Sequence, residues 1–190
     1  MPLLPLEPFV FPNNLFDPAA RCAGADGRWW VLHTRPRAEK SLARRLLAGQ
    51  LRFFLPLYHK QCRGNGRLLT AYHPLFAGYV FLHGDVHDRL QALQTNLVAR
   101  VLQVEDQLEI HDDLLRVHDL MQTGASLSPE ERLQPGTLVE IVHGPLMGMQ
   151  GKIVTRHNKM RFLVAVHFLQ QGVSLDIEGW MIQPLSDKAR

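Results

Sequence analysis

The sequence predicts an α+β protein in which an antiparallel-sheet αβ sandwich precedes a small β-barrel. Between residues 28 and 122, short strand-like runs are interspersed with amphipathic helix-like segments. A polar, proline-bearing stretch interrupts this pattern at residues 123–134, as a linker does. Beyond it lie only short β-branched runs separated by turn residues, at a spacing typical of an all-β barrel. These observations predict two small domains, 28–122 and 135–185.

The first 27 residues carry no pattern of regular structure. They are rich in proline, asparagine, alanine and glycine, so we expect a flexible leader over 1–27. The beginning has no basic region and prolines interrupt its apolar residues, which predicts no signal peptide. No apolar run approaches the roughly 20 residues that a helix needs to cross a bilayer. We therefore expect a cytoplasmic protein with no membrane partner.

The elements of the first domain follow from local patterns. Aromatic and β-branched residues predict a strand over 29–33, and Pro36 suits the first turn of a helix over 38–47. Leu42 and Leu46, four residues apart, define the apolar face of that helix. Glycines about Asn65 predict a hairpin turn within 60–69, and Gly78 marks a bend. The remaining expected elements are strands at 51–57, 74–82 and 98–104 and helices at 86–95 and 112–121.

A glycine-punctuated loop distinguishes the second domain. Its predicted strands are 138–142, 152–155, 161–167, 172–176 and 180–183. The first two flank a loop that contains Gly144, Pro145, Gly148 and Gly151. Glycine adopts backbone angles closed to other residues, and proline fixes φ at a turn, so this loop is tightly specified. Surface loops held in this way usually bind a partner.

Charge is distributed unevenly although the formal net charge is only +3. Residues 28–67 contain ten basic residues and a single acidic one, Glu39, whereas acidic residues predominate in 105–119. Five of the basic residues lie in or beside the first helix: Arg35, Arg37, Lys40, Arg44 and Arg45. Such a cluster suits a phosphate backbone, and the alternative is a solvated face of mixed charge.

Catalytic and metal-binding motifs do not fit the sequence. Residues 148–153 resemble a phosphate-binding loop, but Leu146 replaces its first glycine and Ile153 its serine or threonine. His83 and His87 are four residues apart, yet no glutamate follows His83 as in metalloproteases. No nucleophile elbow or Cys/His pair stands out. We therefore expect a protein that is not an enzyme and that uses no metal or cofactor.

Three segments resemble the NusG-type family of transcription elongation factors. Residues 29–40, Trp-Trp-Val-Leu-His-Thr-Arg-Pro-Arg-Ala-Glu-Lys, resemble the opening of its N-terminal (NGN) domain. Residues 74–81, Pro-Leu-Phe-Ala-Gly-Tyr-Val-Phe, resemble that domain's most recognisable strand, and residues 139–154 resemble the KOW motif of its SH3-like barrel. Around Arg35 and Phe76 the chain is more similar to specialised paralogues, of the RfaH or capsule-locus antiterminator kind, than to the housekeeping factor.

This resemblance implies a transcription elongation and antitermination factor that acts as a monomer. In the family, the N-terminal domain binds the clamp helices of the largest catalytic subunit of RNA polymerase and suppresses pausing or termination. Its basic residues touch the non-template DNA strand, and the KOW domain recruits a small-subunit ribosomal protein or the terminator Rho. The alternative is a KOW-containing RNA-binding or ribosome-associated protein, which would bind ribosomal RNA instead of RNA polymerase.

The resemblance also implies site residues. They are His33, Phe76, Tyr79 and Phe81 for polymerase binding; Arg35, Arg37, Lys40, Arg44 and Arg45 for non-template DNA; and Gly144, Leu146 and Met149 for the KOW partner. Aromatic residues anchor interfaces well, and ordinary core packing is their alternative role. Phe76 and Tyr79 differ in parity along a strand, so they share a face only if the chain bends at Ala77-Gly78. His33 stands where relatives often place an aromatic residue.

Two features of the barrel leave alternatives open. Leu146 and Met149 are either exposed apolar tips between glycines or plugs of the barrel end. Some relatives refold this domain into a helical hairpin. Here residues 139–142 and 162–166 have strong strand preference, so we expect a stable barrel.

Overall fold

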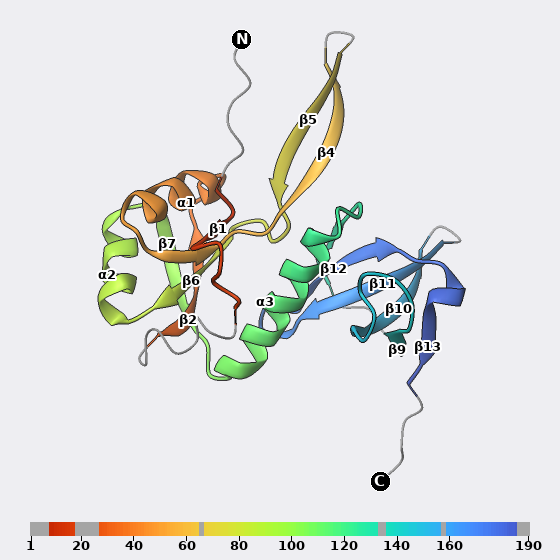
Figure 1. The fold of residues 1–190 in the computed structure, drawn as a ribbon. Coiled ribbons are helices and arrows are strands. Elements are labelled where there is room, and N and C mark those ends of the chain that lie inside the picture. The colour runs from red at the N-terminus through yellow and green to blue at the C-terminus, as the bar shows by residue number, and fades with distance from the viewer. Residues whose placement is uncertain (1–7, 18–26, 65–66, 133–135, 157–158, 186–190) are drawn as a thin grey trace. The chain divides into compact units, whose positions relative to one another are not determined.

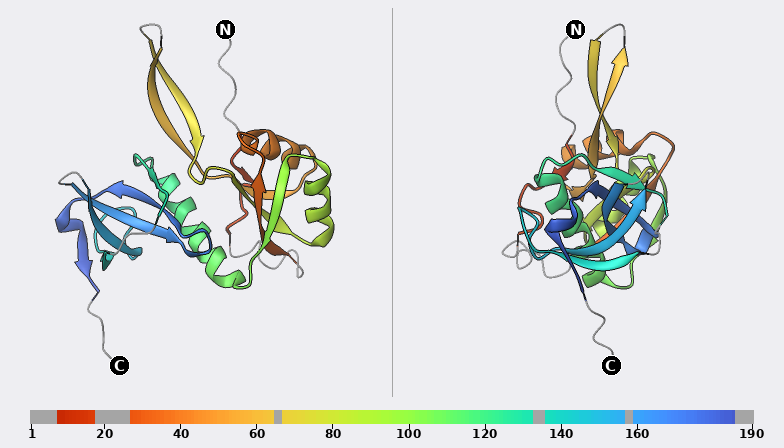
Figure 2. Two further views of the ribbon diagram at one scale, coloured as in Figure 1. Left: turned by 180° about the vertical axis from the view of Figure 1, so that it is seen from behind. Right: turned by 90° about the vertical axis from the view of Figure 1, so that its right-hand side faces the viewer.

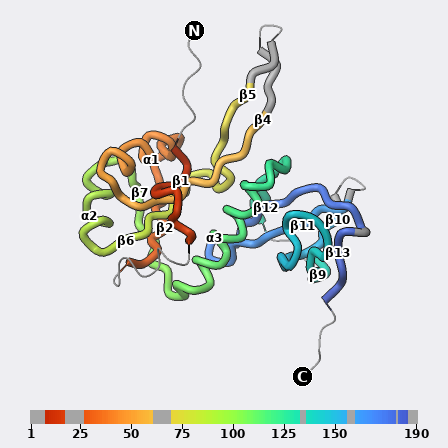
Figure 3. Tube along the Cα trace, in the orientation of Figure 1, coloured from red at the N-terminus to blue at the C-terminus, as the bar shows by residue number. Residues whose placement is uncertain are grey.

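The computed structural model describes residues 8–17, 27–64, 67–132, 136–156 and 159–185 (Figures 1 and 3). The described chain is α+β with antiparallel sheets, as predicted. It divides into two compact units: the first holds residues 1–57 and 76–107, and the second holds residues 58–75 and 108–190. The expected leader, linker and domain boundaries stay predictions.

The first unit is built on a five-stranded antiparallel sheet in the order β1-β3-β6-β2-β7. Two helices, α1 and α2, accompany the sheet (Figure 2). The bounds are β1 Val10–Phe11, β2 Arg28–Thr34, α1 Glu39–Ala48, β3 Arg52–Phe54, β6 Tyr79–Gly84, α2 Val86–Gln94 and β7 Val98–Gln103.

One face of this sheet packs against the helices. Leu42 and Leu46 of α1 and Ala92 of α2 are buried in one cluster with Leu32 and Val80 of the two central strands. The predicted apolar face of α1 is thereby confirmed. Helix α2 begins at a capping box, in which Asp85 and Asp88 exchange side-chain to backbone hydrogen bonds of 2.8 and 3.1 Å. This αβ layer fixes which residues of β2 and β6 turn away from the helices.

The opposite face of the sheet carries aromatic residues. Phe16 stacks on Trp29 with ring centroids 5.8 Å apart and meets Phe54 edge-on at 5.0 Å. Phe54 in turn lies 6.4 Å from Phe81. Phe16 comes from the N-terminal segment whose strand β1 pairs with β3, so part of residues 8–17 contributes to the sheet and the core. Composition alone did not predict this contribution.

The second unit contains a six-stranded antiparallel sheet in the order β13-β9-β10-β11-β12-β8, a separate hairpin β4-β5, and helix α3. Its bounds are β4 Leu57–Gly64, β5 Arg67–Pro74, α3 Gln107–Gln122, β8 Ser128–Glu130, β9 Thr137–Ile141, β10 Gln150–Arg156, β11 Lys159–Val166, β12 Gln171–Asp176 and β13 Ile182–Pro184. Short 3-10 helices, η2 His167–Leu169 and η3 Gly179–Met181, precede β12 and β13. The expected hairpin is confirmed, although the tip of its turn at 65–66 lies outside the described residues.

Helix α3 is held to the barrel by a buried carboxylate. Asp113 has no exposed surface, and its Oδ2 accepts a 2.8 Å hydrogen bond from the backbone N–H of His167. The imidazole Nδ1 of His167 lies 3.1 Å from the same oxygen, and the Arg116 guanidinium donates to Asp113 Oδ1 at 2.6 Å. A row of buried residues on the same helix, Ile110, Leu114, Val117 and Leu120, adds apolar packing. The helix is thus an integral layer of the second unit.

Two sequence expectations need correction. The predicted strand 74–82 is in fact a turn followed by β6, which begins only at Tyr79. Helix α3 begins at Gln107 rather than at residue 112. Strand β8, at Ser128–Glu130, lies within residues 123–134, and Ser174 of β12 donates a 2.7 Å hydrogen bond to its buried Glu130. A proline-bearing polar segment is compatible with an edge strand, which explains why composition did not reveal it.

Candidate functional site

The first candidate site is a row of side chains across three neighbouring strands of the first unit. Tyr79 of β6 lies opposite His33 of β2, and His33 lies opposite Arg100 of β7. The rings of His33 and Tyr79 are 5.2 Å apart. His33 and Arg100 are exposed and Tyr79 is half-buried. We call these three residues the Tyr79 row.

The turn before β6 is fixed by backbone hydrogen bonds. Gly78 has φ +84°, an angle that L residues rarely adopt. Its N–H donates to Oε1 of buried Glu39 at 2.7 Å, and its carbonyl accepts from Thr34 at 2.8 Å. Tyr79 closes the turn by donating to the Phe76 carbonyl at 3.1 Å. The bend that the sequence required for Phe76 and Tyr79 to share a face is therefore present.

Phe76 and Phe81 are buried, in contrast to Tyr79. Phe76 is 1% exposed and Phe81 is fully buried. Their rings meet edge to face, with centroids 5.9 Å apart and planes at 88°. Phe81 and Tyr79 are two residues apart on β6 and so point to the same side of the sheet. The two phenylalanines accordingly form an aromatic layer on the side of the sheet to which Tyr79 points.

The five basic residues of the first helix region lie in the loop before α1 and on α1 itself. Arg35 and Arg37 are exposed in the loop between β2 and α1, where Arg37 has φ +61°. Exposed Arg44 lies one turn after Lys40 on α1 and donates to its carbonyl at 3.3 Å. Arg45 instead lines a cavity of about 450 Å³ together with residues of α2.

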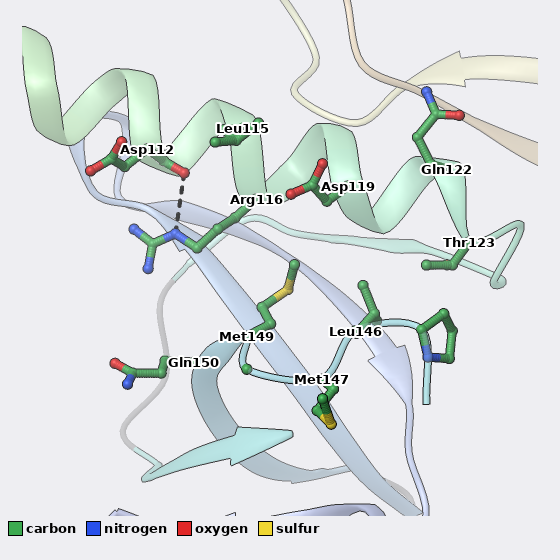
Figure 4. Close-up of a pocket in the computed structure, with 12 residues that line it drawn as sticks. Asp112, Leu115, Arg116, Asp119, Gln122, Thr123, Leu146, Met147, Met149 and Gln150 are labelled. Carbon is green, nitrogen blue, oxygen red and sulfur yellow. Dashed lines mark hydrogen bonds between the residues drawn. The ribbon is translucent and has the colours of Figure 1, made fainter. Parts of the chain in front are cut away.

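The second candidate site is a groove within the second unit (Figure 4). It has a volume of about 750 Å³. One wall is helix α3, and the other is the loop between β9 and β10 with the first residue of β10: Pro145, Leu146, Met147, Gly148, Met149 and Gln150. From α3 come Asp112, Leu115, Arg116, Asp119 and Gln122, and Thr123 follows directly after the helix. The groove thus combines apolar side chains with two carboxylates.

The loop side chains point in different directions. Leu146 and Met149 point toward α3, whereas Met147 points away from it (Figure 4). Leu146 and Met149 are half-buried, and Met147 is 72% exposed. Arg116 is turned back along its own helix, where its Nε donates to the Asp112 carbonyl at 3.2 Å. The loop therefore presents apolar atoms both to the groove and to solvent.

The loop glycines serve two different physical needs. Gly144 and Gly148 have φ of +95° and +87°, which a side chain would disfavour. Gly151 lies in β10, where an added Cβ would be 2.7 Å from the Leu163 carbonyl oxygen and 2.6 Å from the Phe162 ring. The first two shape the loop, and the third allows β10 to approach β11 closely.

Several residues of these sites were not identified from the sequence. Arg100 and Met147 were missed, as were Asp112, Leu115 and Asp119 of α3. Nothing local marks them, because Arg100 joins His33 only through strand pairing and the α3 residues reach the loop only through helix packing. The exposed methionine between two positive-φ glycines was the one available signal.

The described residues offer no metal centre and no membrane span. No cluster of three or more His, Cys, Asp or Glu side chains suited to a metal ion occurs in the described part of the chain. None of the described helices has the length and apolar character needed to cross a bilayer.

The chain is similar to proteins of the transcription machinery. Residues 27–118, slightly less than half of the chain, match the model of the NusG family, described as "Transcription termination factor nusG". The predicted family resemblance is thereby confirmed for this segment, whereas a specialised RfaH-like paralogue and a KOW domain stay predictions. No curated protein matches the chain.

Two solved structures are also similar. One is described as "Domain interaction in Thermotoga maritima NusG"; it is 16% identical, with a TM-score of 0.49, over 85% of this chain and 99% of that one. The other is described as "Crystal Structure of MjSpt4:Spt5 complex conformation B"; it is also 16% identical over 85% of this chain and 99% of that one, with a TM-score of 0.27. Neither likeness is close enough to support a conclusion on function.

Proposed function

We propose that this chain, with its NusG-family segment, is a transcription elongation factor that binds RNA polymerase and suppresses pausing or termination. The observation that carries the proposal is the Tyr79–His33 ring pair, which stands at the surface of the family-matched segment. A factor with this role works in the cytoplasm, by binding and without a catalytic step. Its polymerase contact would be the clamp helices of the largest subunit.

The four sequence-predicted polymerase residues differ in exposure, which supports two different roles for them. Tyr79 and His33 are accessible and serve as the contacts, because Tyr buries much apolar area while its hydroxyl stays hydrated. Phe76 and Phe81 are buried behind them, so we assign these two residues to support of the contact. Glu39 holds the turn that places Tyr79, through its bond to the Gly78 N–H.

Non-template DNA is the proposed ligand of the basic residues around the start of α1. Arg35, Arg37 and Arg44 are exposed, as a phosphate-binding surface requires. Lys40 is half-buried and lies one helical turn from Arg44. Arg45, which was also predicted here, is exposed on α1 and lines a cavity with residues of α2, so we expect it to contribute less.

The groove of the second unit is the proposed site for a recruited partner. Leu146, Met147 and Met149 offer apolar contacts that adapt to a partner surface. A small-subunit ribosomal protein and Rho are the candidate partners. The rival function, a ribosome-associated RNA-binding protein, rests on the barrel alone and assigns no role to the Tyr79 row.

Purified RNA polymerase tests the proposal directly. We expect the protein to bind polymerase, to shorten pauses and to change Rho-dependent release in an in vitro elongation assay. Capture of ribosomal RNA without any effect on polymerase would favour the rival function. Failure to bind polymerase and failure to change elongation would together contradict the proposal.

Replacing Tyr79 with alanine is expected to weaken polymerase binding by about tenfold or more, the usual loss at an aromatic anchor. The change removes a half-buried side chain at a strand end, so the fold should persist. Binding is measured by biolayer interferometry with immobilised polymerase, and folding by circular dichroism. Tyr72→Ala is the matched control, since Tyr72 is 40% exposed on hairpin β4-β5. Equal losses of polymerase binding in both variants would show that the Tyr79 row is not a specific part of the interface.

Replacing Leu146 with serine is expected to weaken binding of the recruited partner several-fold, because Leu146 points into the groove. Titration calorimetry with the purified ribosomal protein and with Rho measures this effect. Met160→Ser is the control, since Met160 is 38% exposed on β11 and does not line the groove. Unchanged binding by Leu146→Ser would place the partner site elsewhere on the barrel.

A further inference from the structure

We propose that Arg100 is a third contact of the polymerase-binding patch, and that the Tyr79 row receives a polymerase segment with a carboxylate beside an apolar side chain. This inference rests on the proposed function and deepens it, because it states the chemistry of the surface that the row recognises. It adds a residue that neither the sequence motifs nor the family resemblance marked.

The pairing of three strands places Arg100 in the row. His33 of β2 is directly opposite Tyr79 on one side and directly opposite Arg100 on the other. Residues that face each other in this way have Cβ atoms about 4.5–5.5 Å apart, so their side chains form one continuous strip. The strip begins with an aromatic ring, continues through an imidazole and ends with a guanidinium.

An irregularity in β7 brings Arg100 to this face. The register shifts between His33, which pairs with Arg100, and Thr34, which pairs with Val98, so Ala99 has no partner of its own. In a regular strand Val98 and Arg100 would point to the same side. Here Val98 is buried in the cluster under the helices, whereas Arg100 is exposed in the row on the other face.

The bulge allows Val98 to be buried while Arg100, two residues later, is exposed on the other face. Without the extra residue, Val98 and Arg100 would lie on the same face of the sheet. Either Arg100 would then be buried in the apolar core, or Val98 would be exposed. Bulges that re-aim a side chain are concentrated near functional sites. The bulge thus provides an observation, independent of exposure, that the position of Arg100 matters.

The charge around the row indicates the chemistry of the partner. Arg100 is joined by exposed Arg35, whose backbone N–H donates to the Leu97 carbonyl at 2.9 Å. Glu39, the acid that touches the neighbouring turn, is 8% exposed and accepts the Gly78 N–H. The accessible charge of Arg35 and Arg100 is positive. A carboxylate complements the guanidinium fork of Arg, and an apolar side chain complements the Tyr79–His33 rings.

A protein surface fits the row better than a nucleic acid does. Backbone phosphates are best matched by several cations in succession, and the row itself has one guanidinium beside two rings. Arginine and tyrosine, with tryptophan, are enriched among the energetic anchors of protein interfaces. Contact with unpaired DNA bases remains an outcome that the experiment separates.

The test compares charge-changing variants on core RNA polymerase free of nucleic acid and on a complete elongation complex. We expect Arg100→Glu to raise the Kd for core polymerase about tenfold, and Arg100→Lys to raise it less, because lysine keeps the charge without the fork. The affinity of the Arg100→Glu variant should also depend less on salt than that of the wild type. Arg132→Glu makes the same charge change at an exposed position of the second unit and should leave the Kd unchanged.

Each alternative result has a distinct meaning. If Tyr79→Ala weakens binding and Arg100→Glu does not, this inference is wrong while the proposed function stands. If Arg100→Glu weakens binding only when the complex contains an exposed non-template strand, the row contacts DNA and the inference is again wrong. If the wild-type chain does not bind polymerase, the proposed function itself fails. Circular dichroism confirms that each variant is folded.

Discussion

Replacing Phe81 with alanine is expected to lower the free energy of unfolding of the first unit by about 3–5 kcal/mol, the usual cost of deleting a buried phenylalanine ring. Phe81 is fully buried on β6, between Phe54 and Phe76. Its removal leaves a cavity lined by two rigid rings that cannot close over it. Chemical denaturation of the full chain, followed by tryptophan fluorescence, measures the loss, because two of the three tryptophans, Trp29 and Trp30, lie in this unit.

Tyr79 provides the matched control for Phe81. The two residues lie two positions apart on β6 and point to the same side, but Tyr79 is half-buried. We expect Tyr79→Ala to cost about 1 kcal/mol or less, as partly exposed positions usually do. The two variants therefore distinguish a residue that supports the fold from one that contacts polymerase. Phe81→Ala should lose polymerase binding only in proportion to the fraction of unfolded protein, whereas Tyr79→Ala should lose binding while it stays folded. A Phe81→Ala variant that stays stable but does not bind polymerase would contradict the support role.

The sequence predicted the helices and strands of this fold better than the long-range contacts that hold them together. Leu42 and Leu46 identified the buried face of α1 because helical spacing is local. The aromatic stretch 76–81 was recognised as important, but its division into turn and strand depends on Gly78 at positive φ and on Glu39, which is distant in sequence. A single bond of this kind cannot be derived from local composition.

The candidate sites show the same limit. The loop glycines were recognised, yet Gly151 is required by the close approach of Phe162 and Leu163 rather than by a turn. Arg100 was missed because strand alternation predicts that it shares the buried face of the sheet with Val98. A bulge in β7 places the two side chains on opposite faces. Residues that act through register or helix packing become visible only when the tertiary structure is known.

The attachment of α3 was the least predictable feature, and it leads to the second large prediction. Asp113→Ala is expected to lower the free energy of unfolding of the second unit by about 3 kcal/mol, the cost of leaving buried donors without an acceptor. Asp113 is fully buried and accepts from the His167 N–H at 2.8 Å and from Arg116 at 2.6 Å. Because the side chains of Arg116 and His167 are 35% and 45% exposed, water offsets part of the loss.

Hydrogen exchange of the full chain measures this effect and locates it. Faster exchange is expected in α3 and around His167, whereas β2 and β6 of the first unit should be unaffected. Asp119→Ala is the control on the same helix, since its side chain is 51% exposed and its loss should cost about 0.5 kcal/mol or less. Asp113→Asn keeps the shape and one acceptor, so its effect should lie between the two. Equal stability of Asp113→Ala and Asp119→Ala would show that the buried carboxylate does not hold α3 to the barrel, and the helix wall of the partner groove would lose its physical basis.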